Sequence, residues 1–136
     1  MPFVIDASVA ASWLLPDEDD PISGAAYRRL ETDDAVAPSL WWVEMRNLLI
    51  VNERRGRIDA RQTARSLTLL AALPINLDFA AEEGALMDLA RRHRLTVYDG
   101  AYLELALRER LPLASLDGAL RDAARAEGIS LIGDER

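Results

Sequence analysis

The sequence predicts an α/β protein in which helices cover both faces of a parallel β-sheet. Two observations lead to this class. Short apolar runs alternate along the chain with longer segments whose apolar residues recur at helical spacing. The first run is apolar at every position, which is typical of a strand buried on both faces. Strands that alternate with helices in this way form βαβ units, and 136 residues suit one domain over residues 1–136.

The first half of the chain contains two predicted strands and four predicted helices. Asp and Ser begin helices because their side chains cap free amide groups, whereas Pro and Gly end them. The expected order is strand 3–5, helix 7–15, helix 22–30, strand 35–37, helix 40–56 and helix 60–73. Ser39 and Asp59 precede the last two helices, and Pro16, Gly56 and Pro74 supply endings.

The second half repeats the alternation. The expected order is strand 75–77, helix 79–94, helix 100–110, strand 113–116, helix 118–128 and strand 130–132. Asp78, Asp99 and Asp117 precede the three helices. Because open α/β sheets bind ligands at the carboxyl ends of their strands, polar residues that follow a strand are candidates for a functional site.

The composition excludes several kinds of chemistry. The chain has no cysteine, a single histidine (His93) and no lysine, since all 16 basic residues are arginine. Thiolate nucleophiles, zinc fingers, two-histidine metal sites and a P-loop lysine are therefore excluded. The net charge of −7 argues against broad non-specific binding of nucleic acid, which depends on cations. It still permits a nuclease, whose metal-binding carboxylates are themselves negative.

The amino-terminal segment MPFVIDASVAAS lacks the basic region of a signal peptide. No apolar run approaches the roughly 18 residues that a membrane span requires. We therefore expect a cytoplasmic protein with no membrane partner.

Glu44 is the most informative residue of the sequence. Its helical neighbours three, four and seven positions away include no cation and are mostly apolar: Leu40, Trp41, Asn47, Leu48 and Val51. A carboxylate on a core-facing stripe is costly unless it is paired, protonated or bound to a metal ion. The alternative is that Glu44 lies at the edge of the stripe and reaches water.

Three aspartates stand where helices are expected to begin: Asp6, Asp99 and Asp117. Helix capping alone would account for each of them. If they converge with Glu44, however, four carboxylates cannot remain ionised side by side without a cation. Oxygen ligands without Cys or His indicate a hard ion, Mg²⁺ or Mn²⁺. Such a site is suited to hydrolysis of phosphate esters.

The chain resembles the PIN-domain ribonucleases and, within them, the VapC-type toxins of bacterial toxin–antitoxin modules. The resemblance covers nearly the whole chain and is carried by VIDASV, WWVEMRNLL, VYDGAYLELAL and LASLDGALRDAA. It implies a three-layer α/β/α fold with a mainly five-stranded parallel sheet, usually as a homodimer. It also implies a catalytic metal site formed by Asp6, Glu44, Asp99 and Asp117. The supporting polar residues are Ser8, Asn47 and Ser115.

The expected function is a Mg²⁺- or Mn²⁺-dependent endoribonuclease that leaves a 5′-phosphate, as the resemblance implies. The resemblance further implies a cognate antitoxin that lies in an apolar groove. Trp41 and Trp42 are adjacent and cannot face the same way, so one of them is a candidate contact for a partner. The basic residues that could meet RNA phosphates, or could simply be solvated, are Arg54, Arg55, Arg57, Arg91, Arg92 and Arg94.

Two other functions remain open. A PIN nuclease of RNA processing that has no antitoxin would share every motif. A metal-dependent adhesion or binding module has the loop D-x-S-x-S after its first strand, and here Asp6 and Ser8 are followed by Ala10 in place of the second serine. A haloacid-dehalogenase-like phosphatase is disfavoured, because it requires a lysine and a second aspartate where Ser8 stands.

Overall fold

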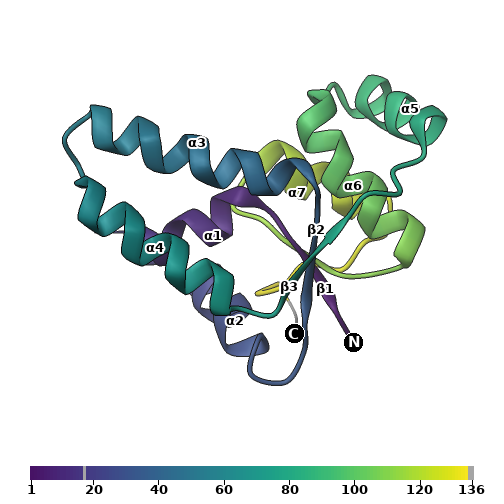
Figure 1. Cartoon of the computed structure of the whole chain (residues 1–136). Helices are drawn as coiled ribbons and strands as arrows, with labels where there is room; N and C mark the ends of the chain where they lie inside the picture. The colour runs from purple at the N-terminus through teal and green to yellow at the C-terminus, as the bar shows by residue number, and fades with distance from the viewer. Residues whose placement is uncertain (17, 135–136) are drawn as a thin grey trace.

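A computed structural model of the chain describes residues 1–16 and 18–134. Its centre is a parallel sheet with the strand order β3-β2-β1-β4 (Figure 1), which confirms the predicted class. The strands are β1 (Phe3–Ile5), β2 (Ala35–Pro38), β3 (Ile75–Asp78) and β4 (Leu113–Ala114). Because they all run in one direction, their carboxyl ends meet at the same edge of the sheet.

Helices lie on both sides of the strands. They are α1 (Ala7–Leu14), α2 (Pro21–Arg29), α3 (Leu40–Arg54), α4 (Ala60–Ala72), α5 (Glu83–His93), α6 (Val97–Glu109) and α7 (Gly118–Ala126). In Figure 1 the first four lie to the left of the strands, and α5 and α6 lie to the right. Helix α6 packs against α5, α7 and three of the strands. None of the helices in the described ranges has the length and apolar character needed to cross a membrane.

The predicted fifth strand is reduced to one bridge. Leu131 pairs in parallel with Leu113, and this single bridge is all the pairing between the two segments within the described residues. The chain leaves the sheet immediately afterwards, because Gly133 adopts a φ of 85°, in the left-handed region that favours glycine. The partner strand β4 is also short and stops at Ala114. The sheet therefore has four strands within the described residues, where the family resemblance implies five.

The starts of two helices differ from the prediction. Helix α5 begins at Glu83, because Glu82 rather than Asp78 accepts hydrogen bonds from the first free amides, and Phe79 lies outside the helix and is exposed. Helix α6 begins at Val97, because Thr96 provides the cap. Asp99 is therefore in the first turn of α6 and does not precede the helix.

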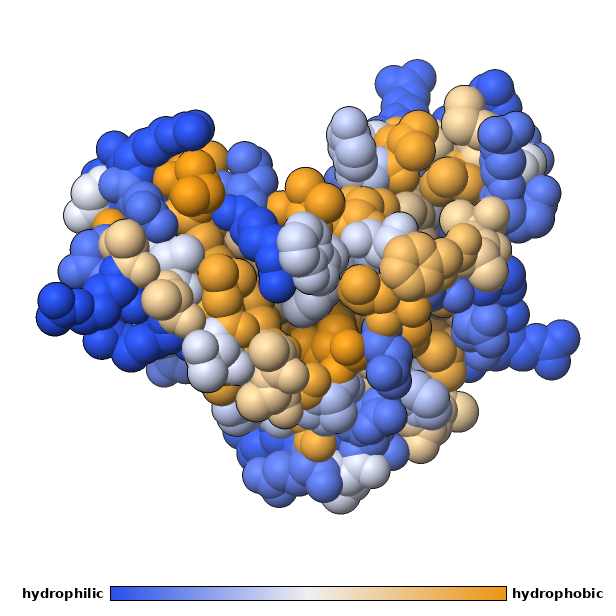
Figure 2. Space-filling view, viewed as in Figure 1, coloured by the Kyte–Doolittle hydropathy of each residue, from blue (hydrophilic) through white to orange (hydrophobic). Residues whose placement is uncertain are grey.

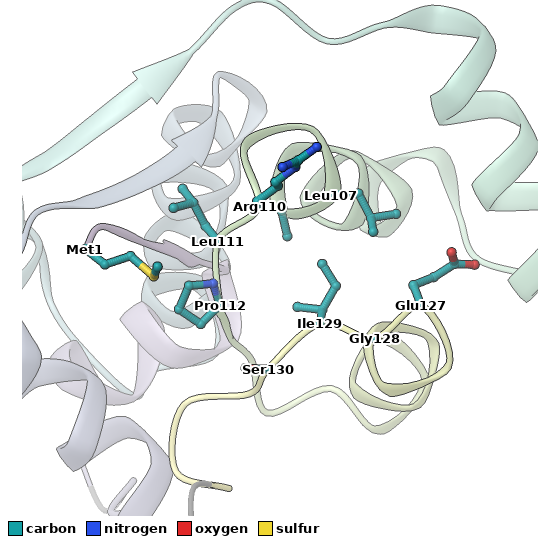
Figure 3. A pocket seen from close by; sticks show the side chains of 10 residues that line it. Met1, Leu107, Arg110, Leu111, Pro112, Glu127, Gly128, Ile129 and Ser130 are labelled. Atoms are coloured by element: carbon teal, nitrogen blue, oxygen red, sulfur yellow. The ribbon is translucent and has the colours of Figure 1, made fainter.

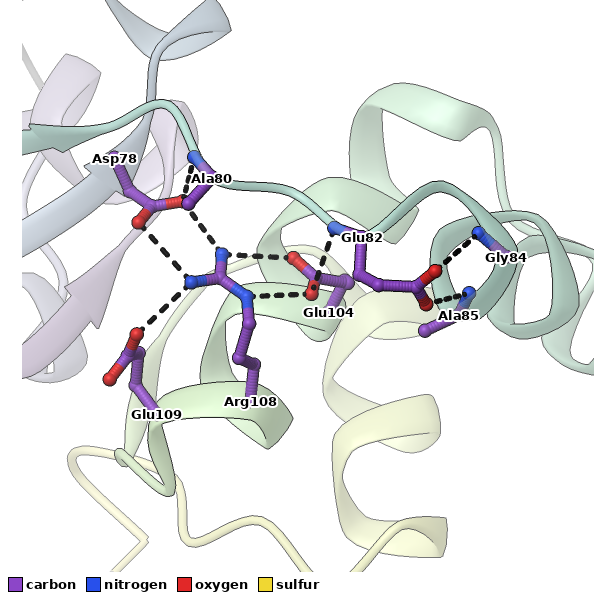
Figure 4. Close-up of polar contacts among 8 residues, drawn as sticks. All are labelled: Asp78, Ala80, Glu82, Gly84, Ala85, Glu104, Arg108 and Glu109. Atoms are coloured by element: carbon purple, nitrogen blue, oxygen red, sulfur yellow. Dashed lines mark hydrogen bonds and ion pairs between the residues drawn. The ribbon is translucent and has the colours of Figure 1, made fainter.

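A partly buried ion cluster fastens the connection between β3 and α5 onto α6 (Figure 4). The guanidinium of Arg108 donates to Asp78 Oδ2 at 2.7 Å and to Glu104 Oε2 at 2.8 Å. Glu104 is only 2% exposed, and it also accepts from the backbone amide of Glu82 at 3.4 Å. These contacts hold α5 and α6 in a fixed relation to the end of β3.

Candidate functional site

Asp6 lies at the carboxyl end of the central strand β1 and is 5% exposed. It is the N-cap of α1, because Oδ1 accepts from the amide of Val9 at 3.1 Å. The same oxygen accepts from the hydroxyl of Ser8 at 2.7 Å, and Oδ2 accepts from the hydroxyl of Ser115 at 2.5 Å. Asp6 therefore performs the capping role and in addition joins the beginning of the chain to the segment after β4.

The two serines link Asp6 to the loop that carries Asp117. The hydroxyl of Ser8 accepts from the amide of Leu116 at 2.9 Å, and the hydroxyl of Ser115 accepts from the amide of Asp117 at 3.0 Å. Each hydroxyl thus receives a backbone hydrogen bond and donates its own proton to one oxygen of Asp6. The charge of Asp6 consequently fixes the backbone of the loop from which Asp117 extends.

Asp117 and Asp99 both belong to helix starts at this edge. Asp117 is exposed and caps α7, with Leu120 donating to Oδ1 at 3.0 Å. Asp99 is partly buried in the first turn of α6, where Thr96 caps the amide of Asp99. Burial and then the charge of Asp117 raise the pKa of the Asp99 carboxyl.

Glu44 approaches the same place from α3 and is partly buried. Its Oε1 accepts from the hydroxyl of Tyr102 at 2.5 Å. Burial raises the pKa of the Glu44 carboxyl, and the charges of Asp99 and Asp6 raise it further, whereas the hydrogen bond from Tyr102 lowers it. The sequence left open whether Glu44 faces the core or reaches water at the edge of the apolar stripe. The structure places it between these two cases, because it is partly buried and feels the charges of two aspartates.

Tyr102 is a part of this arrangement that the sequence did not reveal. It stands on an apolar stretch of α6 and looks like an ordinary core aromatic, which its 1% exposure bears out. One signal was available, because Tyr102 follows Asp99 by three positions and so shares its helix face.

The four carboxylates form no ion pair with a cation within the described residues. In the described part of the chain, none of the ion pairs includes Asp6, Glu44, Asp99 or Asp117. Burial is the largest cause that raises the pKa of the Asp6 carboxyl, and the charge of Asp117 adds to it. The four groups are therefore near enough to repel one another and have no positive partner.

The donor set fits a hard divalent ion, since every available ligand is a carboxylate or hydroxyl oxygen. As the side chains stand, no group of three or more Asp, Glu, His or Cys residues within the described ranges is close enough to hold a metal ion. Mg²⁺ is commonly bound by one or two carboxylates and several water molecules. The site therefore suits an ion that keeps part of its water shell.

The remaining predicted residues lie at different distances from the carboxylates. Asn47 is exposed on α3, one turn beyond Glu44. Arg54 and Arg55 are exposed at the far end of α3, about 15 Å along the helix axis from Glu44 at 1.5 Å per residue. Arg57 is bound to Asn52 Oδ1 at 3.1 Å, so the structure does not bring this cluster to the site.

The second basic cluster, Arg91, Arg92 and Arg94, lies only a few positions before Asp99 in the sequence. Arg91 and Arg94 are exposed at the end of α5, and the start of α6 with Asp99 follows directly. Arg92 is held by Glu127 at 2.8 Å, beside His93, which contacts the same carboxylate at 2.6 Å. Figure 2 shows the molecule hollowed between the lobe of α3 and the lobe of α5 and α6, the helices that supply Glu44 and Asp99.

The two adjacent tryptophans face in different directions, as expected. Trp41 is buried, whereas Trp42 is half exposed with the guanidinium of Arg46 3.7 Å from its ring centroid.

A cavity of about 300 Å³ lies elsewhere, at the amino ends of β1 and β4 (Figure 3). Its lining includes Met1, Pro112 and the carboxylate of Glu127, and none of the four carboxylates discussed above. It is therefore separate from the candidate site.

Fold and site together define a parallel α/β domain with an acidic cluster at the carboxyl edge of its sheet. Residues 3–126 match the family model of the PIN domain, and the chain belongs to this family. The predicted family is thereby confirmed. No match was found among curated proteins.

Three solved structures share the fold. PAE2754 from Pyrobaculum aerophilum is 21% identical, with a TM-score of 0.70 over 90% of this chain and 84% of that one. VapC20 of Mycobacterium tuberculosis, a toxin that cleaves the sarcin–ricin loop, is 12% identical, with a TM-score of 0.58 over 89% and 94%. FitAcB from Neisseria gonorrhoeae is 17% identical, with a TM-score of 0.58 over 98% and 97%.

Proposed function

We propose that the protein is a Mg²⁺- or Mn²⁺-dependent endoribonuclease and the toxin of a type II toxin–antitoxin pair. The observation that carries the proposal is how the four carboxylates are held at the carboxyl edge of the sheet. Ser115 links Asp6 to the loop of Asp117, and Tyr102 links Glu44 to the helix of Asp99. None of the ion pairs among the described residues includes any of the four. Helix capping would explain Asp6 and Asp117, but it does not explain Glu44, which lies in the interior of α3. PIN-domain membership and the fold shared with VapC20 support the toxin assignment.

Asp6, Asp99 and Asp117 are the residues that would hold the ion, and Glu44 would either join them or orient the attacking water. A bound divalent ion supplies positive charge that stabilises the charge developing on the phosphodiester and makes water a better nucleophile. Ser8 and Ser115 orient Asp6 and favour its charged form against the effect of burial, because both donate to its oxygens. Arg91 and Arg94 are exposed and able to contact RNA phosphates.

The test is cleavage of RNA in Mg²⁺ or Mn²⁺ by the wild type and by Asp6→Asn and Asp99→Asn. Both substitutions keep the shape of the side chain and remove a charged ligand, so cleavage should be abolished. Asp59→Asn is the matched control, because Asp59 is also a helix cap but belongs to an exposed capping box on α4. If Asp6→Asn cleaves at the wild-type rate, the assignment of the site is wrong.

The toxin role is tested with the product of the neighbouring gene. We propose that this antitoxin binds the protein, suppresses cleavage and changes the fluorescence of Trp42, which is half exposed in the free chain. A nuclease of RNA processing would cleave in the same way, but no neighbouring product would inhibit it. We also propose a homodimer acting in the cytoplasm, and sedimentation of the purified protein tests its subunit number.

A further inference from the structure

We propose that Tyr102 is a positioning residue whose hydroxyl fixes the carboxylate of Glu44 beside Asp99. Glu44 then offers its second oxygen, Oε2, to the divalent ion or to the attacking water. The inference rests on the proposed function, because it concerns the same site. Tyr102 lies within the segment VYDGAYLELAL, but the resemblance assigns no role to this tyrosine.

The contact between the two residues joins distant parts of the chain. The hydroxyl of Tyr102 on α6 donates to Oε1 of Glu44 on α3 at 2.5 Å, across 58 positions of sequence. It is the sole hydrogen bond of the Glu44 carboxylate within the part of the chain that the structure describes. One oxygen is therefore committed to Tyr102, and Oε2 remains available to accept a ligand.

The position of the hydroxyl is set by the core and does not depend on the site. Tyr102 is 1% exposed, so its ring cannot change rotamer without disturbing its neighbours. Helix α6 is also held against rotation by α5. A Cβ added at Gly100 would come within 3.3 Å of Leu86 Cδ1 and 3.6 Å of Ala90 Cβ, so the two helices are in close contact there.

The helix face explains why this tyrosine serves the site. Asp99 and Tyr102 are three positions apart on α6 and are neighbours on its surface. One rigid helix thus supplies a carboxylate and, one turn later, the donor that holds Glu44 against the same helix.

Without the donor, the Glu44 side chain has several rotatable bonds and repulsive neighbours. A long carboxylate in that situation turns toward water, since nothing in the described residues attracts it back. The hydroxyl of Tyr102 prevents this rotation and also favours the charged form of Glu44. Phenylalanine would fill the same space and lack only this donor.

The experiment compares Tyr102→Phe with Tyr98→Phe, a matched control on the same helix. Tyr98 lies one turn earlier and is 65% exposed. Mn²⁺ binding is measured by calorimetry without RNA, and kcat and KM are measured on an RNA oligonucleotide. Removal of a group that orients a metal ligand typically costs about 10- to 100-fold in metal affinity or activity. We expect such a loss in Mn²⁺ affinity or in kcat for Tyr102→Phe, with KM nearly unchanged, and no loss for Tyr98→Phe.

The double variant Tyr102→Phe/Glu44→Gln identifies the route of the effect. If Tyr102 acts through Glu44, adding Tyr102→Phe to Glu44→Gln should cause no further loss, because coupled residues are non-additive. Glu44→Asp provides a second test with Tyr102 intact. It keeps the charge but withdraws it from the hydroxyl, and it should reproduce the loss even if Tyr102→Phe folds poorly.

Several results would overturn the inference. They are wild-type Mn²⁺ affinity and kcat in Tyr102→Phe, a rise in KM alone, an equal loss in Tyr98→Phe, or an additive loss in the double variant. Failure of the proposed function looks different. In that case the wild type itself does not cleave RNA, while the Mn²⁺ titration still reports whether Tyr102 positions Glu44.

Discussion

Replacement of Asp99 by asparagine should stabilise the metal-free protein and remove most of its stabilisation by metal ions. Asp99 repels both Asp117 and Glu44, and no cation among the described residues offsets this. The structure makes it the best site for the test, because Thr96 and not Asp99 caps the start of α6. The substitution therefore relieves repulsion without removing a cap.

The size of the effect follows from the competing interactions. Two like charges 4 Å apart repel by about 1 kcal/mol in water and by about 4 kcal/mol at an effective dielectric constant of about 20. The carboxylates here are partly exposed and not in contact, so we take about 1 kcal/mol for each of the two neighbours. Asparagine loses the favourable interaction of a negative charge with the helix dipole, about 0.3–1 kcal/mol. A net gain of about 1 kcal/mol remains, which raises Tm by about 4 °C.

In the wild type, a bound metal ion should relieve the same repulsion between the carboxylates and so stabilise the fold. An ion that binds only the native state adds about 2.7 kcal/mol at a hundredfold excess over its dissociation constant. Thermal melting of both proteins, first in chelator and then in millimolar Mg²⁺ or Mn²⁺, measures both changes. If Asp99→Asn melts below the wild type in chelator, and the wild type is indifferent to the ions, Asp99 contributes only to local helix structure and the electrostatic reasoning fails.

The pH dependence supplies an internal check on the same variant. Burial and like charges raise the pKa of the carboxyls of Asp6, Glu44 and Asp99. A group with a raised pKa contributes stability that is present below its unfolded pKa and is lost as the pH rises through its folded pKa. The metal-free wild type should therefore gain stability as the pH falls from neutral toward the ordinary pKa of a carboxyl group. The gain should be smaller in Asp99→Asn.

Two further substitutions test how the site is supported. Ser115→Ala removes a hydrogen-bond donor from the buried carboxylate of Asp6. It should lower the free energy of unfolding, measured by urea titration, by about 1.5–3 kcal/mol. An unchanged free energy would mean that water replaces the hydroxyl. Arg108→Met leaves the buried Glu104 without its partner and should cost about 3 kcal/mol or more. Arg125→Met, at an exposed ion pair, should cost less than about 1 kcal/mol, and equal costs would contradict the role of burial.

The sequence was most informative where one physical signal dominated. The apolar run before Asp6 predicted a central strand, because a run without polar positions is buried on both faces wherever it lies. The start of α7 was also predicted, since Asp117 is a strong cap directly after the predicted strand 113–116. The start of α6 was not, because Thr96 and Asp99 are both good caps and only the backbone conformation decides between them.

The prediction of a full fifth strand was wrong for a related reason. Residues 130–132 have the right apolar character, but the length of a parallel ladder depends on its partner, and β4 spans only Leu113 and Ala114. The next residue, Ser115, donates its hydroxyl proton to Asp6, which lies 109 positions away in the sequence. A local pattern cannot reveal a partner at that separation.

The same limit explains why the four carboxylates were predicted and Tyr102 was not. A carboxylate near the core is recognisable from sequence alone, because burial of its charge is costly and demands an explanation. A buried tyrosine demands none, since its ring accounts for its position and its hydroxyl needs only one partner. The identity of that partner, Glu44, is set by the packing of α6 between α5 and the sheet, which brings α6 within reach of α3. Charged groups of a site are thus visible as exceptions to burial rules, whereas the neutral groups that orient them obey those rules and emerge only from the assembled fold.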